Sequence, residues 1–144
     1  MESCELCASP GGELLWQDDV CRVVRVGGGE AEAFPGFCRV IWRAHARELS
    51  DLTAPERRHL FDVLVATEAA VRAVLRPDKI NLASLGNVVP HLHWHVIPRW
   101  ADDSHFPSPI WAAAVRQPTI SPLRSQPVSA DLRAALTTHL GESR

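Results

Sequence analysis

The chain has 144 residues, of which 46% are hydrophobic, so it is long enough to bury one core and is expected to form one folded unit. Its formal net charge of −2 offers no overall attraction for nucleic acid or for an anionic membrane. The sequence has no run of about 18 apolar residues that would predict a membrane span, and its first residues lack the basic and apolar regions of a signal peptide. We therefore expect a cytoplasmic protein that has neither nucleic acid nor membrane as a partner.

The first part of the chain predicts three strands followed by a helix. Residues 14–16, 20–26 and 37–42 form apolar runs, and residues 30–32 between the second and third run are expected to form a loop. The helix follows a capping-box pattern that begins at Thr53, and its apolar residues then recur at helical spacing. The sequence Arg-Pro-Asp at 76–78 ends this helix.

The second part of the chain predicts two more strands, an irregular tail and a short helix. The strands are expected at residues 79–85 and 92–97, and Pro98 is expected to end the second one because proline cannot donate to a strand ladder. Residues 101–127 contain five prolines and predict an irregular segment that wraps the body, whereas residues 129–140 can form a terminal helix. The sum is an α+β fold, with an antiparallel sheet and a helix on one face.

Three histidines alternate with apolar residues along the short apolar run that contains the last predicted strand. They are His91, His93 and His95, and Leu92 and Trp94 lie between them. Alternate side chains of a strand share one face, so we expect the three imidazoles on the same face of the sheet. Adjacent imidazoles repel when protonated and need partners when buried. Such a row therefore suits a metal ion or a phosphoryl group better than simple packing.

The pattern from His91 to Ile97, His-φ-His-φ-His-φ-φ with φ apolar, resembles the signature of the histidine triad (HIT) superfamily. The flanks at 81–87 and 98–99 match as well, and a less specific resemblance extends from Cys4 to about Trp111. The resemblance implies a HIT-like α+β fold, with about five antiparallel strands, one packed helix and an irregular C-terminal tail, usually in a homodimer. We expect a HIT-like domain at residues 1–111, and an extension at residues 112–144 that packs on the same domain.

The resemblance also implies an activity. HIT-type enzymes are nucleotide hydrolases or nucleotidyl transferases, and by position His93 is the nucleophile that attacks the α-phosphate and forms a covalent nucleotidyl intermediate. His95 would donate to a phosphate oxygen or protonate the leaving atom, and His91 would hold the tautomer of the nucleophile or bind metal. The candidate substrates are a dinucleoside polyphosphate, a nucleoside phosphoramidate and an adenylated species. A hydrolase is favoured, because the sequence shows no second lobe for a sugar-phosphate acceptor.

Three residues before the triad are candidates for substrate binding. Asn87 matches a position where HIT proteins carry an amide that contacts phosphate, and Asn81 can contact ribose or cap a turn. Gly86 allows the backbone to approach a phosphate, or simply turns the chain. Asp102 and Asp103 follow the strand, but adjacent carboxylates in a loop are usually solvated. We therefore expect no magnesium requirement in the chemical step.

A zinc site is predicted near the N-terminus. Cys4 and Cys7 have the spacing of two thiolates on tetrahedral zinc. The resemblance supplies two further ligands, because some HIT and galactose-1-phosphate uridylyltransferase-like proteins add a loop histidine and the first triad histidine, here His45 and His91. Idle thiols or a redox pair are the alternatives. Trp42 stands where HIT sequences commonly have a proline, which suggests that it shapes the base pocket.

Two other functions fit the same residues. In one, the three triad histidines hold a catalytic zinc that keeps an open coordination position. In the other, the protein is a zinc-stabilised regulatory domain that binds nucleotides without cleaving them. The remaining cysteines and histidines are expected to be packed or solvated side chains rather than ligands; they are Cys21, Cys38, His59, His105 and His139.

Overall fold

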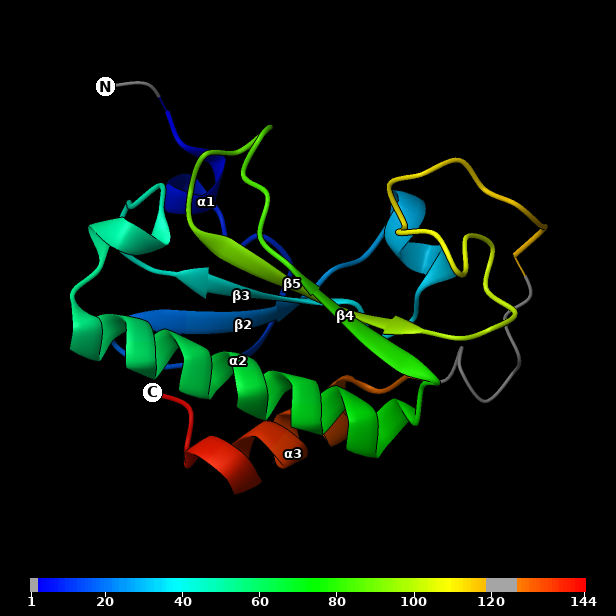
Figure 1. The fold of residues 1–144 in the computed structure, drawn as a ribbon. Helices are drawn as coiled ribbons and strands as arrows, with labels where there is room; N and C mark the ends of the chain where they lie inside the picture. The colour runs from blue at the N-terminus through cyan, green and yellow to red at the C-terminus, as the bar shows by residue number, and fades with distance from the viewer. Residues whose placement is uncertain (1–2, 119–126) are drawn as a thin grey trace.

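The computed structural model describes residues 3–118 and 127–144 (Figure 1). Five antiparallel strands form one sheet in the order β1-β2-β3-β5-β4. The strands are β1 (Glu13–Gln17), β2 (Cys21–Arg25), β3 (Cys38–Trp42), β4 (Lys79–Ala83) and β5 (His93–Arg99). The predicted α+β class and the five-stranded sheet are therefore confirmed. None of the described helices combines the length and the apolar character needed to cross a membrane.

Helices cover one face of the sheet, as Figure 1 shows. The long helix α2 (Ala54–Leu75) packs against the strands, and α3 (Ser129–Leu140) lies against α2 and β1. The buried side chains Leu132 and Leu136 join α3 to the main core, so the C-terminal helix belongs to the same packed body. The opposite face of the sheet carries the short helix α1 (Glu5–Ala8), whose Leu6 packs against the sheet, together with the chain that leads into β5.

Both ends of α2 follow from the local sequence. The Thr53 hydroxyl accepts a hydrogen bond from the Glu56 backbone N–H, and the Glu56 carboxylate accepts one from the Thr53 N–H at 2.8 Å. This is the predicted capping box, which satisfies two backbone donors at the start of the helix. At the other end, Arg76 takes a left-handed conformation with φ of 48° and stops the helical repeat.

The chain enters β3 beside the end of α2 through a glycine. Gly36 has a φ of +87°, a region that side chains with a Cβ atom rarely adopt. A Cβ atom at this position would also lie 1.9 Å from Cδ1 of Leu75. The glycine is therefore required twice, once by the backbone conformation and once by the close approach of α2.

Several local details differ from the predictions. Residues Gly29–Ala33 form a 3-10 turn, η1, rather than a loop, and a second short turn, η2 (Leu49–Asp51), precedes α2. Strand β4 ends at Ala83, two residues early. Strand β5 continues through Pro98, because β3 pairs with β5 only as far as Val96 and β4 is the one neighbouring strand at Pro98. Proline is tolerated where a strand has an open side.

The tail after β5 is irregular from residue 101 to 118, as predicted, but one of its carboxylates is not solvated. Asp103 is buried and forms an ion pair with the buried Arg99, with N···O distances of 2.8 and 3.0 Å. Its oxygens also accept hydrogen bonds from the backbone N–H groups of residues 100, 105 and 106. The expectation of a solvated Asp103 was therefore wrong. The remaining part of the predicted tail, residues 119–126, lies outside the described residues.

Candidate active site

Strand β5 places two of the triad histidines side by side. His93 and His95 point to the same face, as period-two alternation requires, and their ring centroids are 5.0 Å apart. In the register with β3, Ile41 lies opposite His93 and Arg39 lies opposite His95. Both residues are only 7% exposed. The hydrogen bonds of their rings therefore determine which nitrogen carries the proton and which carries the lone pair.

The hydrogen bonds of these rings fix their tautomers. Nδ1 of His93 lies 2.5 Å from the carbonyl oxygen of His91, and Nδ1 of His95 lies 2.9 Å from the carbonyl oxygen of Ala83. A carbonyl oxygen can only accept, so each Nδ1 carries the proton. In the neutral rings each Nε2 therefore carries a lone pair. A neutral imidazole with a free Nε2 is a nucleophile toward phosphorus.

The environment keeps both rings neutral. Burial is the largest cause that lowers the pKa of His93, and the charge of Arg39 lowers it further, against the opposing effect of the hydrogen bond to His91. Burial also lowers the pKa of His95 to about 4, with smaller contributions from His93 and Arg39. At neutral pH, both side chains are thus uncharged in the substrate-free protein.

A pocket of about 540 Å³ lies over these two histidines. Its lining includes Arg39, Gly86, Asn87 and Trp111 as well as the two imidazoles. Two of the predicted substrate-binding residues, Gly86 and Asn87, are therefore at the pocket. Gly86 has a φ of +73°, so it turns the chain back over the face that carries the histidines.

The third candidate, Asn81, is not among the residues that line this pocket. It lies within β4, and its Oδ1 accepts a hydrogen bond of 2.7 Å from Nη1 of Arg99. Two further residues near the histidines were not predicted from the sequence. Ser84 donates from its hydroxyl to the carbonyl oxygen of His93 at 2.9 Å, and Arg39 lines the pocket. An arginine within an otherwise apolar strand was the available signal for Arg39.

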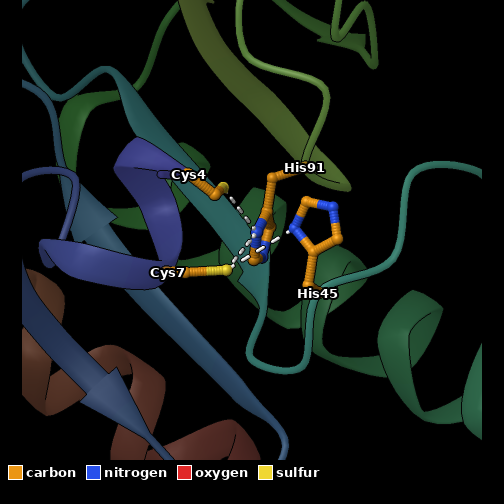
Figure 2. Close-up of side chains that lie close together, drawn as sticks. All are labelled: Cys4, Cys7, His45 and His91. Atoms are coloured by element: carbon orange, nitrogen blue, oxygen red, sulfur yellow. Dashed lines mark hydrogen bonds between the residues drawn. The ribbon is translucent and has the colours of Figure 1, made fainter. Parts of the chain in front are cut away.

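His91 has a different environment from the other two triad histidines. It precedes β5, so strand alternation does not govern its side chain, and its ring turns toward Cys4 and Cys7 (Figure 2). Nε2 of His91 lies 2.6 Å from the carbonyl oxygen of Trp42 and donates to it. Nδ1 of His91 therefore carries the lone pair and faces the two thiols. Strand geometry thus aligns only His93 and His95, and the expectation that it would align all three imidazoles is corrected for His91.

The four predicted metal ligands meet at one place, as Figure 2 shows. Sγ of Cys4 lies 3.3 Å and Sγ of Cys7 lies 3.5 Å from Nδ1 of His91, and Sγ of Cys7 lies 3.5 Å from Nδ1 of His45. Arg22 holds the helix that carries the cysteines, because its guanidinium donates to the carbonyl oxygen of Leu6 at 2.7 Å. The cluster could therefore hold a metal ion.

The donor set fits zinc. Bonds of about 2.3 Å to sulfur and about 2.1 Å to nitrogen at tetrahedral angles separate the two donor atoms by roughly 3.6 Å. The observed S···N distances of 3.3 to 3.5 Å are close to that value. The bond from His91 to the Trp42 carbonyl also resembles the outer hydrogen bonds that orient histidines on metals.

The other cysteines and histidines lie apart from the pocket. Cys21 and Cys38 are buried core residues, as predicted, and burial raises the pKa of each thiol to about 12. Nε2 of His59 lies 2.6 Å from the Asp18 carboxylate. Trp42 does not shape the pocket as expected, because its side chain is buried in the core on the α2 side of the sheet.

Comparison with known proteins gives a consistent result. Residues 15–102 match the family model of the HIT domain. Bis(5'-adenosyl)-triphosphatase from Saccharomyces cerevisiae is 36% identical over 72 residues, which are 46% of this chain and 35% of the relative. AP-4-A phosphorylase from Mycobacterium tuberculosis is 32% identical over 78 residues, which are 50% of this chain and 40% of the relative. The matched region thus covers well under half of either relative.

Solved structures share the fold over nearly the whole chain. A histidine triad protein from Marinobacter aquaeolei VT8 superposes with a TM-score of 0.74 at 25% identity, covering 96% of this chain and 97% of that one. A histidine triad protein from Bradyrhizobium japonicum gives a TM-score of 0.66 at 24% identity, with 89% and 91% covered. The similarity includes the C-terminal region beyond the matched domain.

Proposed function

Because the chain belongs to the HIT family, we propose that it is an enzyme that cleaves nucleotides at the α-phosphate through a covalent nucleotidyl-His93 intermediate. One observation carries the proposal. His93 and His95 share one face beneath a pocket, and each has its Nδ1 proton engaged by a backbone carbonyl and its Nε2 available. Two neighbouring imidazoles of this kind can supply a nucleophile and a proton carrier.

The first step forms a bond between Nε2 of His93 and the α-phosphorus, using the Nε2 lone pair. The bond from phosphorus to the leaving atom breaks, and that atom keeps the electron pair and takes a proton from His95. In the second step, a water oxygen attacks the phosphorus, the P–N bond breaks, and the electron pair returns to His93. The proton released by water passes to His95, so the protein is restored.

His95 needs a proton on Nε2 for the first step, but burial holds its pKa at about 4 in the substrate-free protein. A bound phosphate is negative, and a nearby negative charge raises the pKa of an imidazole. We therefore expect substrate binding to bring the proton to His95. The hydrogen bond to Ala83 keeps Nδ1 protonated and directs this exchange to Nε2.

The proposed substrates are nucleotides in which a nucleoside α-phosphate is joined to a leaving group: a dinucleoside polyphosphate, a phosphoramidate or another adenylated species. The names of the two relatives, a bis(5'-adenosyl)-triphosphatase and an AP-4-A phosphorylase, support this class. Water is the proposed acceptor. No magnesium is proposed in the chemical step, since Asp103 already accepts hydrogen bonds from Arg99 and from backbone N–H groups.

We propose that Cys4, Cys7, His45 and His91 hold a zinc ion. The donor set and its spacing support this, and the ion would cross-link the N-terminal segment around α1, the loop after β3 and the chain that leads into β5. His93 and His95 lie outside this donor set. This arrangement favours a structural metal over a catalytic zinc that all three triad histidines would share.

A homodimer in a reducing cytoplasm completes the proposal. Strand β4 is at the edge of the sheet and presents the exposed Leu82, while Phe61 and Val65 are exposed on α2. An unpaired strand edge next to exposed apolar side chains is a surface that a second copy can cover.

The four cysteines are free, which is the state expected in a reducing compartment.

Intact-protein mass spectrometry, without acid in the quench, tests the proposed mechanism. Wild type, His93→Ala and the control His59→Ala would be mixed rapidly with diadenosine triphosphate. We expect a nucleotidyl adduct on wild type and on the control, and no adduct and no turnover with folded His93→Ala. Turnover that survives in His93→Ala would contradict the proposal. Nucleotide binding by wild type without any product would instead indicate a regulatory protein, and zinc lost specifically with His93→Ala would indicate a catalytic metal.

A further inference from the structure

Arg39 places a positive charge in the pocket beside the proton carrier. The register of β3 and β5 sets Arg39 directly opposite His95, and the pocket lining includes both residues. Residues opposite each other in an antiparallel pair have Cβ atoms only about 4.5–5.5 Å apart. Consistent with this closeness, the charge of Arg39 contributes to the low pKa of His95, although burial is the larger cause.

The guanidinium of Arg39 is anchored but incompletely paired. Nη1 donates to the carbonyl oxygen of Gly11 at 3.1 Å, which holds the side chain along the sheet. Nε is buried and donates to no residue within 3–118 or 127–144. Burial lowers the pKa of Arg39, while the nearby charge of Glu5, another residue of the pocket lining, opposes that shift. An arginine remains charged at neutral pH under these conditions.

The position of Arg39 places its charge on the side of the pocket from which the leaving group would depart. Ile41, not Arg39, lies opposite the nucleophile His93, so the charge is displaced toward His95. His95 is the residue proposed to protonate the leaving atom. Trp111 stands on the same side, with its ring 5.1 Å from that of His95. The leaving group would therefore depart along Arg39, His95 and Trp111.

We propose that Arg39 is a specificity-determining residue whose guanidinium binds the phosphate oxygens of the leaving group. The inference rests on the function proposed above. The fork of guanidinium N–H donors matches phosphate oxygens and stabilises the negative charge that grows on a phosphate as the P–O bond breaks. An amine leaving group has no such oxygens. The enzyme should thus favour substrates that release a phosphate chain over those that release an amine.

Two substrates with the same adenylyl half test this role. Diadenosine triphosphate releases a nucleotide, whereas adenosine 5′-phosphoramidate releases ammonia, and kcat/KM would be measured for both with wild type, Arg39→Gln and Arg39→Lys. Arg43→Gln is the matched control, because it removes one positive charge from an exposed residue just after β3 that does not line the pocket. Circular dichroism and thermal unfolding would establish that each variant is folded.

Loss of a charge-assisted contact predicts that Arg39→Gln lowers kcat/KM for diadenosine triphosphate by about 10- to 100-fold, and for the phosphoramidate by less than about 3-fold. Arg39→Lys keeps the charge without the fork and should fall between Arg39→Gln and wild type; it serves as the test if Arg39→Gln does not fold. Arg43→Gln should match wild type.

Equal losses on both substrates, or no loss on the triphosphate, would overturn the role of Arg39. A wild-type protein that forms no histidine adduct and cleaves neither substrate would instead refute the proposed function itself. The two failures are thus distinguishable.

Discussion

Arg99 and Asp103 form an ion pair that is buried on both sides and organises the chain after β5. The carboxylate accepts two hydrogen bonds from the guanidinium, which in turn donates to Asn81 at 2.7 Å and to the carbonyl oxygen of Ser108 at 2.8 Å. The rings of Phe34 and Phe106 lie 5.6 Å from the guanidinium carbon. This network fixes the segment that carries Trp111 to the side of the pocket.

Replacing Asp103 by Asn should destabilise the protein strongly. The variant leaves the buried charge of Arg99 without its counter-ion, a change that typically costs about 3–5 kcal/mol. Urea unfolding followed by circular dichroism measures the difference from wild type. Asp19, which is exposed, supplies the matched control, since Asp19→Asn should change stability by less than about 0.5 kcal/mol. Equal stability of Asp103→Asn and wild type would contradict a stabilising ion pair.

The same carboxylate predicts a dependence of stability on acid. Burial alone would raise the pKa of Asp103, but the hydrogen bonds from Arg99 and from three backbone N–H groups outweigh it and hold the pKa at about 2. An unfolded aspartate has a pKa of about 3.9, so the stabilisation is complete above that value and is lost as the pH falls toward 2. Its size is about 2–3 kcal/mol.

Unfolding free energies of wild type and Asp103→Asn between pH 5 and pH 2 test this expectation, with pH values chosen to span roughly the two pKa values. The difference between the two proteins should shrink as the pH falls. A constant difference across that range would show that Asp103 is not the group responsible.

Gly36 offers a separate test of packing. Gly36→Ala should destabilise by about 2–4 kcal/mol, since it combines an unfavourable φ with overpacking against Leu75. Gly28→Ala is the matched control, because Gly28 has a φ of +74° but no atom within 4 Å of the added Cβ, and so measures the backbone cost alone. Thermal and urea unfolding compare the two. If both variants lose the same stability, the contact with Leu75 does not matter.

Removing a metal ligand should remove the proposed zinc. Cys7→Ser and His45→Ala are expected to lower the zinc content of purified protein from about one ion to well below that, and to lower the melting temperature, because the proposed ion would join three segments. Native mass spectrometry gives the metal content of each variant. Cys38→Ala is the control cysteine, since Cys38 is buried in the core and lies outside both groups of possible metal donors among the described residues, and it should keep its zinc even if its stability falls. Wild-type protein that binds no zinc would refute the site.

Much of the fold could be predicted because local patterns in this chain agree with its packing. The Thr53 capping box and the alternation around His93 depend on neighbours in sequence, and both appear as expected. The burial of Asp103 could not be predicted in the same way. Its burial depends on Arg99, on backbone N–H groups that a turn brings together, and on rings from distant segments, none of which a run of two acidic residues reveals.

In the candidate site too, residues placed by local sequence could be predicted, whereas residues placed by the assembled sheet could not. The spacing of Cys4 and Cys7 indicated a pair of ligands, but the resemblance to HIT proteins was needed to join them to His45 and His91. Arg39 could not be identified from the sequence, because its place in the site depends on strand register. The register pairs β3 with β5, which are far apart in sequence, and sets Arg39 opposite His95. Register of this kind is a property of the assembled sheet.

His91 connects the proposed metal site with the pair of histidines in the pocket. Its ring contacts the thiols of Cys4 and Cys7, and its own carbonyl oxygen holds the Nδ1 proton of His93. A displacement of α1 that moves the His91 ring would therefore change, through this one residue, the orientation of His93, the proposed nucleophile. In the proposed mechanism, the N-terminal segment would thus support the reacting imidazole indirectly, through the ring and the backbone of His91.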